Sequence, residues 1–507
     1  MAARLLDVAI CGYGPTGMAA AALLARRGHS VGVFERWPTL YGLPRMATID
    51  GESARILQAA CDIDAALRNS LPRKRYLFAN QDGEVLIDHQ WDKPHVCGFP
   101  FRISLHQPDV EDAMDAAARA RGAEIHQGCE VTGVSQLGDR VVLEVQGKQV
   151  EARYLIGADG ARSTVRGALG IESDTWPTRN AWLTFDATRK RELPNFFGVS
   201  PDGRVAAIFC APQGRSHSII PLGREHLRFN FETDPDTRHD GRLDRELAYR
   251  KLEEIYGIGE GDVEVYRQAV YPFEGRLAQT WRKGRAFLTG DAAHVMTPFL
   301  GQGGCSALRD AINLTWKLDL VLRGLAPDAL LDTYEAERKP HVRVHIEGSD
   351  RAGALAFVAD PAAAAERDRR LRESQPPAPA EPVLVSEILD SHPLAGTLGP
   401  QAVVRHSGRE GRFDDLFGWG FQLLGWQQDP SAALDAAQRA FLKHLGTTVA
   451  AISAQNDVTG AYERFFRDHD VRVVLVRPDF VVFGAGKDPS DTGLVVQRLR
   501  DALRGPY

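Results

Sequence analysis

The sequence predicts an α/β protein of several domains, with a parallel sheet in its amino-terminal part. Two observations predict this class: short apolar runs typical of buried strands alternate with helical patterns, and glycine-rich turns follow several of those runs. A third concerns organisation: Asp360 to Pro382 contains an alanine run, the stretch ERDRRLRES and then PPAPAEP, typical of a helix end followed by an exposed linker. The roughly 360 residues before this break exceed one compact core, so we expect a second domain inserted within them.

The composition is that of an ordinary globular protein, with 507 residues, 44% hydrophobic and 25% charged. Lys and Arg number 61 and Asp and Glu 67, a mild acidity that argues against a nucleic-acid partner. No apolar run reaches the roughly 18 residues needed to span a membrane, and the first ten residues, which include Arg4 and Asp7, do not resemble a signal peptide. Scattered cysteines without metal-like spacing indicate a cytoplasmic protein with reduced thiols and no metal site: Cys11, Cys61, Cys97, Cys129, Cys210 and Cys305.

The first strand and helix are joined by a glycine-rich turn. The apolar run Asp7–Cys11 leads into Gly12-Tyr13-Gly14-Pro15-Thr16-Gly17 and an Ala/Leu-rich helix, and a second apolar strand ends at Glu35, 23 positions after Gly12. Glycines let the backbone approach a pyrophosphate, the helix amino terminus offers free N–H groups, and an acid at this distance can accept from a ribose hydroxyl. The sequence therefore predicts a dinucleotide site; the alternative is a tight turn that binds nothing.

Two further motifs follow apolar strands. Residues 154–166, YLIGADGARSTVR, run into Asp159-Gly160, and taken alone they also fit a strand end with a turn and a Ser-capped helix. Residues 285–317 place Asp291 at the carboxyl end of a strand, where ligands of open α/β sheets bind, and continue through a glycine loop into a long helix. The amino end of that helix would stabilise negative charge on a flat ring. His294 could be a ligand or a base, although a satisfied histidine in a turn is the simpler interpretation.

The three motifs, in this order, resemble the single-component flavoprotein aromatic hydroxylases, the group that includes 4-hydroxybenzoate hydroxylase and phenol hydroxylase. The resemblance covers about the first 355 residues. Within this group the chain is most similar to 3-(3-hydroxyphenyl)propionate hydroxylases and polyketide hydroxylases. Three stretches carry that similarity: Pro44-Arg45-Met46 with Ile49-Asp50, His106-Gln107-Pro108-Asp109, and Tyr334-Glu335-Ala336-Glu337-Arg338-Lys339-Pro340.

The resemblance implies a resident FAD and an NAD(P)H reductant that visits without a Rossmann domain of its own. It implies that Glu35 and the glycine turn hold the ADP half, that Arg45 and Gln107 contact the pyrophosphate and ribityl region, and that Asp291 contacts a ribityl hydroxyl. Asp159 is expected to serve both the pyrophosphate and the nicotinamide cofactor. Many family members have Asn where this chain has Cys305, so only backbone contacts are expected there. The full set of expected cofactor contacts is Gly12, Gly14, Pro15, Thr16, Gly17, Glu35, Arg36, Arg45, Gln107, Val131, Asp159, Asp291, Pro298, Gly301, Gln302, Gly303, Gly304 and Cys305.

The implied fold is α/β: a Rossmann-like FAD-binding domain, an inserted mixed β-sheet substrate domain and a C-terminal thioredoxin-like domain. The expected FAD-binding domain comprises residues 1–72, 96–176 and 278–372, and the substrate-binding domain comprises 73–95 and 177–277. Alternating patterns such as Leu227–Phe231 indicate strands in the inserted part. Residues 383–507 form the C-terminal domain, with strands expected at Gly420–Leu424, Val471–Arg477 and Phe480–Phe483 and helices at Asp435–Leu445 and Thr492–Leu503. This segment contains no cysteine, so no disulfide exchange is expected there.

The implied activity is hydroxylation of a phenolic ring, ortho or para to its hydroxyl, by oxygen transfer from a flavin hydroperoxide, with molecular oxygen and NAD(P)H consumed. Asp50, His217 and Tyr271 are the candidates for activating the phenol, each with an alternative interpretation as a capping or core residue. A Baeyer–Villiger oxygenase acting on a polyketide and a non-catalytic FAD-binding redox sensor are the alternative functions. A plain NAD-dependent dehydrogenase is disfavoured, because it has no use for the Gly290-Asp291 region. A homodimer is one possible assembly, and the sequence fixes neither the substrate nor the choice of NADH or NADPH.

Overall fold

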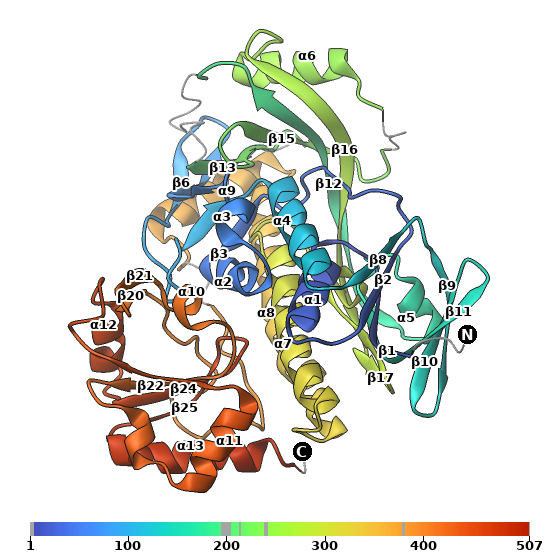
Figure 1. Cartoon of the computed structure of the whole chain (residues 1–507). Helices are drawn as coiled ribbons and strands as arrows, with labels where there is room; N and C mark the ends of the chain where they lie inside the picture. The colour runs from blue at the N-terminus through green and yellow to red at the C-terminus, as the bar shows by residue number, and fades with distance from the viewer. Residues whose placement is uncertain (1–4, 194–203, 212–213, 238–241, 378–380, 506–507) are drawn as a thin grey trace.

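The structure is a computed structural model that describes residues 5–193, 204–211, 214–237, 242–377 and 381–505. Two large β-sheets and a separate carboxyl-terminal unit make up the molecule (Figure 1). Among the described residues, no helix is long and apolar enough to cross a membrane.

The first large sheet is mainly parallel and positions the three sequence motifs at one edge. Strands β18, β11, β1, β2 and β8 lie side by side in parallel, with β17 antiparallel at the end and the β9–β10 hairpin attached to β11. Because carboxyl ends of parallel strands share an edge, Gly12, Asp159 and Asp291 come together. The bounds are β1 (Leu6–Cys11), β2 (Val31–Glu35), β8 (Glu124–Gln127), β9 (Val131–Leu137), β10 (Arg140–Val145), β11 (Lys148–Gly157), β17 (Arg282–Lys283) and β18 (Ala286–Leu288).

Helices flank this sheet and bury apolar faces against it. The contiguous core contains eight residues of α1, including Ala19, Leu23 and Leu24, and eight residues of α7. α1 packs between α4 and α7. The bounds are α1 (Pro15–Arg26), α2 (Gly51–Ala60), α3 (Ile63–Ala66), α4 (Gln107–Ala120), α5 (Thr164–Ala168) and α7 (Gly303–Leu322), with a small sheet of β3 (Thr48–Asp50), β4 (Leu71–Pro72) and β7 (Arg102–Ser104) beside α2.

The second large sheet has two buried faces with different partners. Its order is β19-β16-β12-β15-β14-β13-β5-β6, so β5 and β6, distant in sequence, complete the inserted strands. The outer face packs Phe185, Phe209 and Phe229 against α6 (Arg245–Tyr256), which covers the sheet in Figure 1. The inner face, toward the first sheet, carries Trp182 and Phe273. The strands are β5 (Arg75–Asn80), β6 (Val85–Gln90), β12 (Ser173–Arg189), β13 (Val205–Cys210), β14 (His217–Pro221), β15 (His226–Thr233), β16 (Val263–Ala278) and β19 (His294–Val295).

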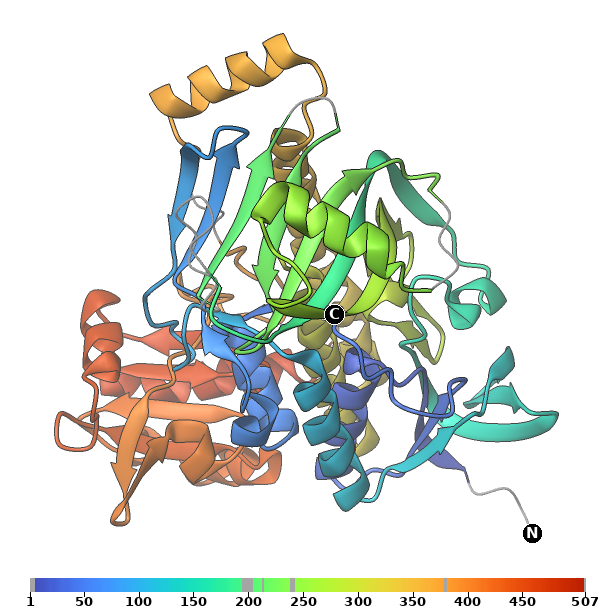
Figure 2. The same ribbon diagram turned by 90° about the horizontal axis from the view of Figure 1, so that it is seen from above.

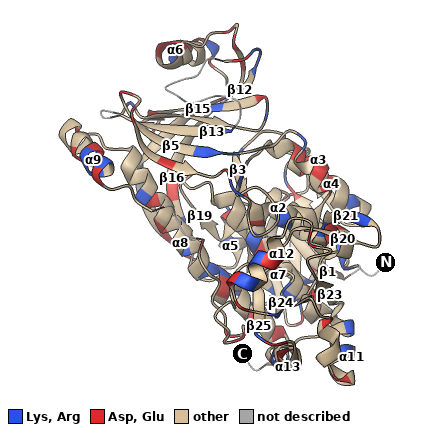
Figure 3. Ribbon diagram, turned by 90° about the vertical axis from the view of Figure 1, so that its left-hand side faces the viewer, with Lys and Arg blue, Asp and Glu red and all other residues tan. Residues whose placement is uncertain are grey.

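Two helices lead away from these sheets. The long α8 (Thr333–Ala356) packs along α7 and the inner side of the inserted sheet. The segment expected to be a helix end followed by an exposed linker begins with a 13-residue helix, α9 (Pro361–Glu373), which lies at the margin of the molecule (Figure 2). Asp360 caps this helix, and charges of both signs spaced three and four residues apart, such as Glu366 with Arg369 and Arg370, stabilise it (Figure 3). The expected helix end is therefore confirmed, and exposed residues without helical structure follow it from Ser374 to Pro377.

The carboxyl-terminal unit has the order β22, α11, β23, α12, β24, β25, α13. Its four-stranded sheet runs β23-β22-β24-β25, with β22 and β23 parallel and the other pairs antiparallel. The expected strands and helices are confirmed within a few residues, while β23 (Thr448–Ile452) and α12 (Ala461–Asp468) are additional. The other bounds are β22 (Gln422–Trp426), α11 (Ala436–Leu445), β24 (Val473–Val476), β25 (Val482–Gly486) and α13 (Thr492–Ala502), preceded by β20 (Val403–His406), β21 (Arg409–Arg412) and α10 (Phe413–Phe417).

Candidate functional site

The three glycines of the first turn meet different surroundings. Gly12 has φ of +98°, and a Cβ there would lie 2.8 Å from the Asp159 Cα, while a Cβ at Gly17 would run into the carbonyl of Gly12. A Cβ at Gly14, by contrast, would meet no atom within 4 Å. Two glycines thus let the turn pack closely on the neighbouring chain, and the third leaves its outer side open. Pro15 is the first residue of α1, and no side chain caps its N–H groups, which are free for an anion.

A cavity of about 310 Å³ opens at this turn. Its walls come from the carboxyl ends of β1, β2 and β11, from residues 36–45 after β2, and from the first turns of α4. Ten residues expected to contact the cofactor line it: Gly12, Gly14, Pro15, Glu35, Arg36, Arg45, Gln107, Val131, Asp159 and Asp291. Thr16, Gly17 and the loop 298–305 do not line it. The open face at Gly14, the free helix terminus and the acid on β2 fit the ADP half of a flavin dinucleotide.

Glu35 is fixed by the backbone on both sides of the cavity. Its Oε2 accepts from the Tyr13 N–H at 2.8 Å, and its Oε1 accepts from the Trp37 N–H at 2.9 Å. The Tyr13 ring is buried, and its hydroxyl donates to Asp115 on α4. The carboxylate therefore holds the glycine turn against the end of β2 while retaining lone pairs for a ribose hydroxyl.

Gln107 fixes the segment that carries Arg45. Its Oε1 accepts from the Arg45 and Met46 N–H groups, both at 2.7 Å, and its Nε2 donates to Glu111. The Arg45 guanidinium lies 4.2 Å from the centre of the Tyr41 ring and faces the cavity. Gln107 thus acts on the cofactor region through backbone that it positions.

Asp159 connects the second motif to the third. Its carboxylate accepts from the Ser163 hydroxyl at 2.6 Å and from the Val165 N–H at 3.1 Å, and Ser163 caps α5. Arg166 on α5 donates to the Ala292 carbonyl at 2.8 Å, next to Asp291. Asp291 is exposed at the cavity, and the protein packed around its carboxyl raises the pKa of that group, a rise that the charges of His294 and Arg45 oppose.

The glycine loop before α7 packs on residues 46–48. Gly301 has φ of +63°, a Cβ there would lie 3.5 Å from Thr48, and a Cβ at Gly304 would run into the Met46 side chain. α7 begins at Gly303 with no side-chain cap, so its N–H groups point into the loop. Cys305 is fully buried with its thiol toward the Gly301 carbonyl, and burial raises the pKa of that thiol to about 12.

Asp50, a candidate base, is fully buried at the start of α2. It caps the helix by accepting from the Ser53 N–H at 2.8 Å, and it pairs with Arg309 at 2.5 Å and with Gln302 at 3.2 Å. Burial acts to raise the pKa of this carboxyl, but the charge of Arg309 outweighs it and holds the pKa well below its usual range. A group that stays ionised in a buried ion pair is poorly suited to taking up a proton, so this geometry favours a capping and ion-pair role.

His217 and Tyr271 lie on opposite faces of the inserted sheet. His217 stacks on Phe209 and pairs with the Tyr256 hydroxyl of α6, on the outer face, and burial lowers the pKa of its imidazole to about 4. Tyr271 is opposite Trp182 in the strand register, which places it on the inner face. The Tyr271 side chain is 49% exposed, and the charges of Asp291 and Arg45, which line the cofactor cavity, act on its hydroxyl. Of the two, therefore, only Tyr271 lies near the cofactor cavity.

Only one of the two ring nitrogens of His294 has a hydrogen-bond partner among the described residues. Its Nε2 lies 2.6 Å from Asp310, whereas its Nδ1 is buried without a partner among the described residues. Asp310 also pairs with Arg338 and accepts from the Gly290 N–H at 3.1 Å. The histidine therefore helps to hold the turn at Asp291 and lies behind it.

A buried ionic cluster joins the inserted sheet to the segment that carries Arg45. From the sequence, its members are predicted only as strand residues. Asp186 is fully buried and pairs with Arg228 and Arg267, both at 2.7 Å. Arg228 also donates to the Pro44 and Arg45 carbonyls, and Arg267 donates to Pro44. Charged residues at alternate positions of an otherwise apolar strand are the signal that points to such a cluster.

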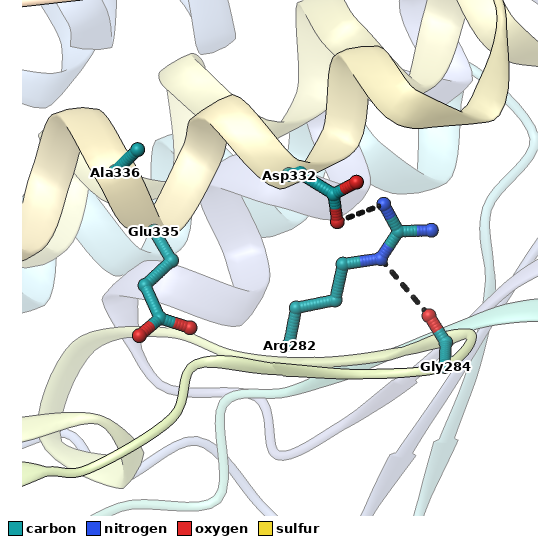
Figure 4. A pocket seen from close by; sticks show the side chains of 5 residues that line it. All are labelled: Arg282, Gly284, Asp332, Glu335 and Ala336. Carbon is teal, nitrogen blue, oxygen red and sulfur yellow. Dashed lines mark hydrogen bonds and ion pairs between the residues drawn. The ribbon is translucent and has the colours of Figure 1, made fainter. Parts of the chain in front are cut away.

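A larger hollow of about 550 Å³ lies away from these motifs, between β17 and the start of α8 (Figure 4). Its charged lining groups neutralise one another: Arg282 pairs with Asp332, and Glu335 accepts from the Trp281 N–H and pairs with Lys339. No charged group there is left for a ligand within the described lining.

The comparisons with known proteins show the family to which the chain belongs. Residues 5–349 match the family described as FAD binding domain, and residues 396–502 match the HcaD C-terminal domain. A protein of Rhodococcus jostii described as a probable NADH-specific resorcinol 4-hydroxylase is 33% identical over 99% of this chain and 96% of its own length. A 3-(3-hydroxyphenyl)propionate/3-hydroxycinnamic acid hydroxylase of Mycolicibacterium smegmatis is 31% identical over 95% of this chain and 90% of its own.

A solved structure supports the same family assignment. The ternary complex of aklavinone-11 hydroxylase with FAD and aklavinone superposes with a TM-score of 0.76 at 26% identity, covering 99% of this chain and all of that one. The chain belongs to the FAD-binding-domain family of flavoprotein aromatic hydroxylases. It is an FAD-dependent aromatic monooxygenase that draws its electrons from a nicotinamide cofactor.

Proposed function

We propose that the enzyme hydroxylates a small phenol, with resorcinol as the first candidate substrate and NADH as the reductant. The full-length similarity to the Rhodococcus protein supports this choice. The observation that carries the proposal is an aromatic wall on the inner face of the inserted sheet, opposite the loop before α7. Trp182 and Phe273 pack on Phe299 of that loop, with ring centres 6.4 and 5.3 Å apart, and the Tyr76 hydroxyl donates to the Phe299 carbonyl. This wall suits a flat ring and excludes water from it.

The chain contributes binding, orientation and electrostatics. FAD, when bound, accepts electrons from the nicotinamide cofactor and delivers one oxygen atom to the substrate ring. The glycine turn and Glu35 hold its ADP half. The amino end of α7 supplies N–H groups and a positive dipole end that favours negative charge near the loop 301–304.

Among the three candidates for activating the phenol, the geometry best supports Tyr271. It lies on the inner face near Asp291 and Arg45, where its hydroxyl can accept a hydrogen bond from the phenol O–H, which orients the phenol and raises the electron density of its ring without a proton transfer. Asp50 is proposed instead to hold α2 and the loop together through Arg309, and His217 to stabilise the sheet against α6.

Steady-state assays with the purified holoenzyme test the proposal. Resorcinol should accelerate NADH oxidation, and the product should be a trihydroxybenzene that carries one atom of labelled dioxygen while the other appears in water. Tyr271→Phe should leave flavin reduction nearly intact while peroxide rises and product per NADH falls; Ile219→Val, on the outer face, is the control. An ester from a ketone substrate, with no phenol accepted, would establish the Baeyer–Villiger alternative instead.

The domain roles are also proposals. The order βαβαββα and the sheet order of the C-terminal unit support a thioredoxin-like domain at residues 383–507, and its lack of cysteine supports a packing role without redox exchange. The inserted sheet supports a substrate domain at 73–95 and 177–277, part of which lies outside the described residues, with 1–72, 96–176 and 278–372 binding FAD. All six cysteines are free, which supports a cytoplasmic location.

A further inference from the structure

Three polar side chains form a row across the inner face of the inserted sheet. Thr184 on β12 is directly opposite Asn230 on β15, and Asn230 is directly opposite Ser218 on β14. All three are buried, with exposed fractions of 5%, 6% and 1%. We call these residues the polar row. Residues directly opposite in neighbouring strands point to the same side of a sheet, so the row faces the first domain and not α6.

The hydrogen bonds along the polar row run in one direction and end on a free donor. The Thr184 hydroxyl donates to Asn230 Oδ1 at 2.8 Å, and Asn230 Nδ2 donates to Ser218 Oγ at 2.8 Å. Within the described part of the chain, the Ser218 hydroxyl makes no donor bond of its own. Its proton is therefore available to an oxygen atom placed against the inner face.

The polar row interrupts an apolar surface. The same line of cross-strand neighbours continues through Ile208 and Phe78, and Ala269 flanks Thr184 on the other side. Burying hydroxyl and amide groups in such a surface costs free energy that apolar side chains of similar shape would avoid. A role in recognition accounts for their presence there.

The neighbouring side chains of the same sheet locate the polar row on the inner face. On one side, Asp186 and Arg228 hold the Pro44 and Arg45 carbonyls at the cofactor cavity. On the other side, Trp182 packs on Phe299 of the loop before α7. The polar row therefore lies between the cavity wall and the glycine loop.

The charges around the polar row favour a neutral partner. Arg228 already donates through Nε, Nη1 and Nη2 to Asp186 and to the two carbonyls. On the other side of the row lies Glu232, opposite Trp182, and burial raises the pKa of its carboxyl. A carboxylate at the row would approach two acidic side chains, while four of the five N–H groups of Arg228 are already bonded, so a neutral hydroxyl is the better fit.

We propose that the polar row binds the second, non-reacting hydroxyl of a dihydric phenol, with Ser218 as the donor, and so selects neutral dihydric phenols over monohydric phenols and phenolic acids. This inference rests on the proposed function. Ser218 contacts the substrate, while Asn230 and Thr184 orient its hydroxyl.

The test measures selectivity with the holoenzyme. Resorcinol and phenol are compared in the wild type, Ser218→Ala and Thr184→Val, with kcat/KM from substrate-stimulated NADH oxidation and binding from the change in flavin absorbance. Loss of one neutral hydrogen bond predicts about a 3- to 10-fold fall in the resorcinol-to-phenol ratio of kcat/KM for Ser218→Ala. Phenol, which lacks the second hydroxyl, should lose less than resorcinol in Ser218→Ala. Thr184→Val should give a smaller fall in the same direction.

Ile219→Val is the matched control, because Ile219 neighbours Ser218 on β14 but packs on the outer face. An equal loss with both substrates would mean that Ser218 only stabilises the sheet, and an unchanged ratio would mean that it makes no contact; either result overturns the inference. If the wild type responds to no phenol in either measurement, the proposed function fails and the inference fails with it. A wild-type preference for 3-(3-hydroxyphenyl)propionate over resorcinol overturns the inference alone.

Discussion

At the scale of single residues, the cofactor site depends on side chains that hold backbone. Glu35 bonds two N–H groups on either side of the cavity, and Gln107 bonds two more beside Arg45. Such residues affect affinity in two ways, through direct contact and through the shape of the turn. Their removal should therefore weaken binding without abolishing the fold.

Glu35→Ala should weaken FAD binding by about 1–3 kcal/mol, because a charged hydrogen-bond acceptor and two backbone anchors are lost. Titration of the apoprotein with FAD, followed by flavin fluorescence, measures the change. Glu151→Ala, which removes a surface carboxylate paired with Arg140, is the control and should bind FAD normally. Unchanged affinity in Glu35→Ala would contradict the assigned role.

FAD should be bound without a covalent bond. Cys305 is the thiol nearest the glycine loop among the described residues, and burial keeps it protonated and therefore poorly nucleophilic. Acid precipitation should release all the yellow colour into the supernatant. Flavin retained in the pellet of the wild type, and released in Cys305→Ser, would show that this prediction is wrong.

At the scale of elements, the start of α1 separates glycines needed for folding from a glycine needed for binding. Gly17 is pressed against the Gly12 carbonyl, whereas Gly14 faces open space with ordinary negative φ of −79°. The same residue type thus has two different physical roles within four positions.

Gly14→Ala should keep the stability of the apoprotein and lose FAD affinity, because the added methyl group occupies the path of the pyrophosphate. Gly17→Ala should lower the melting temperature of the apoprotein itself, since its methyl group meets backbone. Thermal unfolding of both apoproteins, combined with FAD titration, distinguishes the two effects. Equal melting temperatures for the two variants would contradict this assignment.

Sequence patterns predicted most elements that carry a motif or a strong apolar period. The strand–turn–helix around Gly12 and most of the C-terminal strands and helices are confirmed, because each has local chemistry that defines it. α12 was not predicted, because its stability depends on burying Tyr462, Phe465 and Phe466 against a distant sheet. For α9 the sequence predicted a helix end, but not the start of the helix, which depends on the Asp360 cap. The partners of Asp50 could not be predicted either, because Arg309 lies 259 positions away and only the folded chain brings the two together.

At the scale of the whole molecule, a buried ionic network fixes the C-terminal unit to the FAD-binding domain. Arg477 bonds Glu337 of α8 at 2.8 and 2.9 Å and pairs with Asp479 at 2.5 Å. Lys317 of α7 pairs with Glu337 at 2.8 Å, and Arg477 lies 5.1 Å from the Trp316 ring centre. All of these charges are buried, so breaking one pair leaves others uncompensated.

Arg477→Met should destabilise the protein by about 3–5 kcal/mol, because Glu337 and Asp479 lose their main cation. Burial acts to raise the pKa of Glu337, but the charges of Arg477 and Lys317 hold it below its usual value of 4.5. The stabilisation is therefore complete above about pH 4.5 and is lost as pH falls below it, so the difference between variant and wild type should shrink in acid. Denaturant unfolding across pH measures this, with exposed Arg464→Met as the control.

The polar side chains of α7 have a consequence for how the protein unfolds. Near its start Arg309 bonds Gln302 and Asp50 at the glycine loop, and one turn further on Asn313 bonds both Glu337 and Asp479. The first turns of α7 thus lie at the glycine loop, and its middle is hydrogen-bonded to Asp479 of the C-terminal unit. Opening either end disrupts the same helix, so FAD binding should slow amide hydrogen exchange in β24 and β25, far from the flavin, as much as in β1.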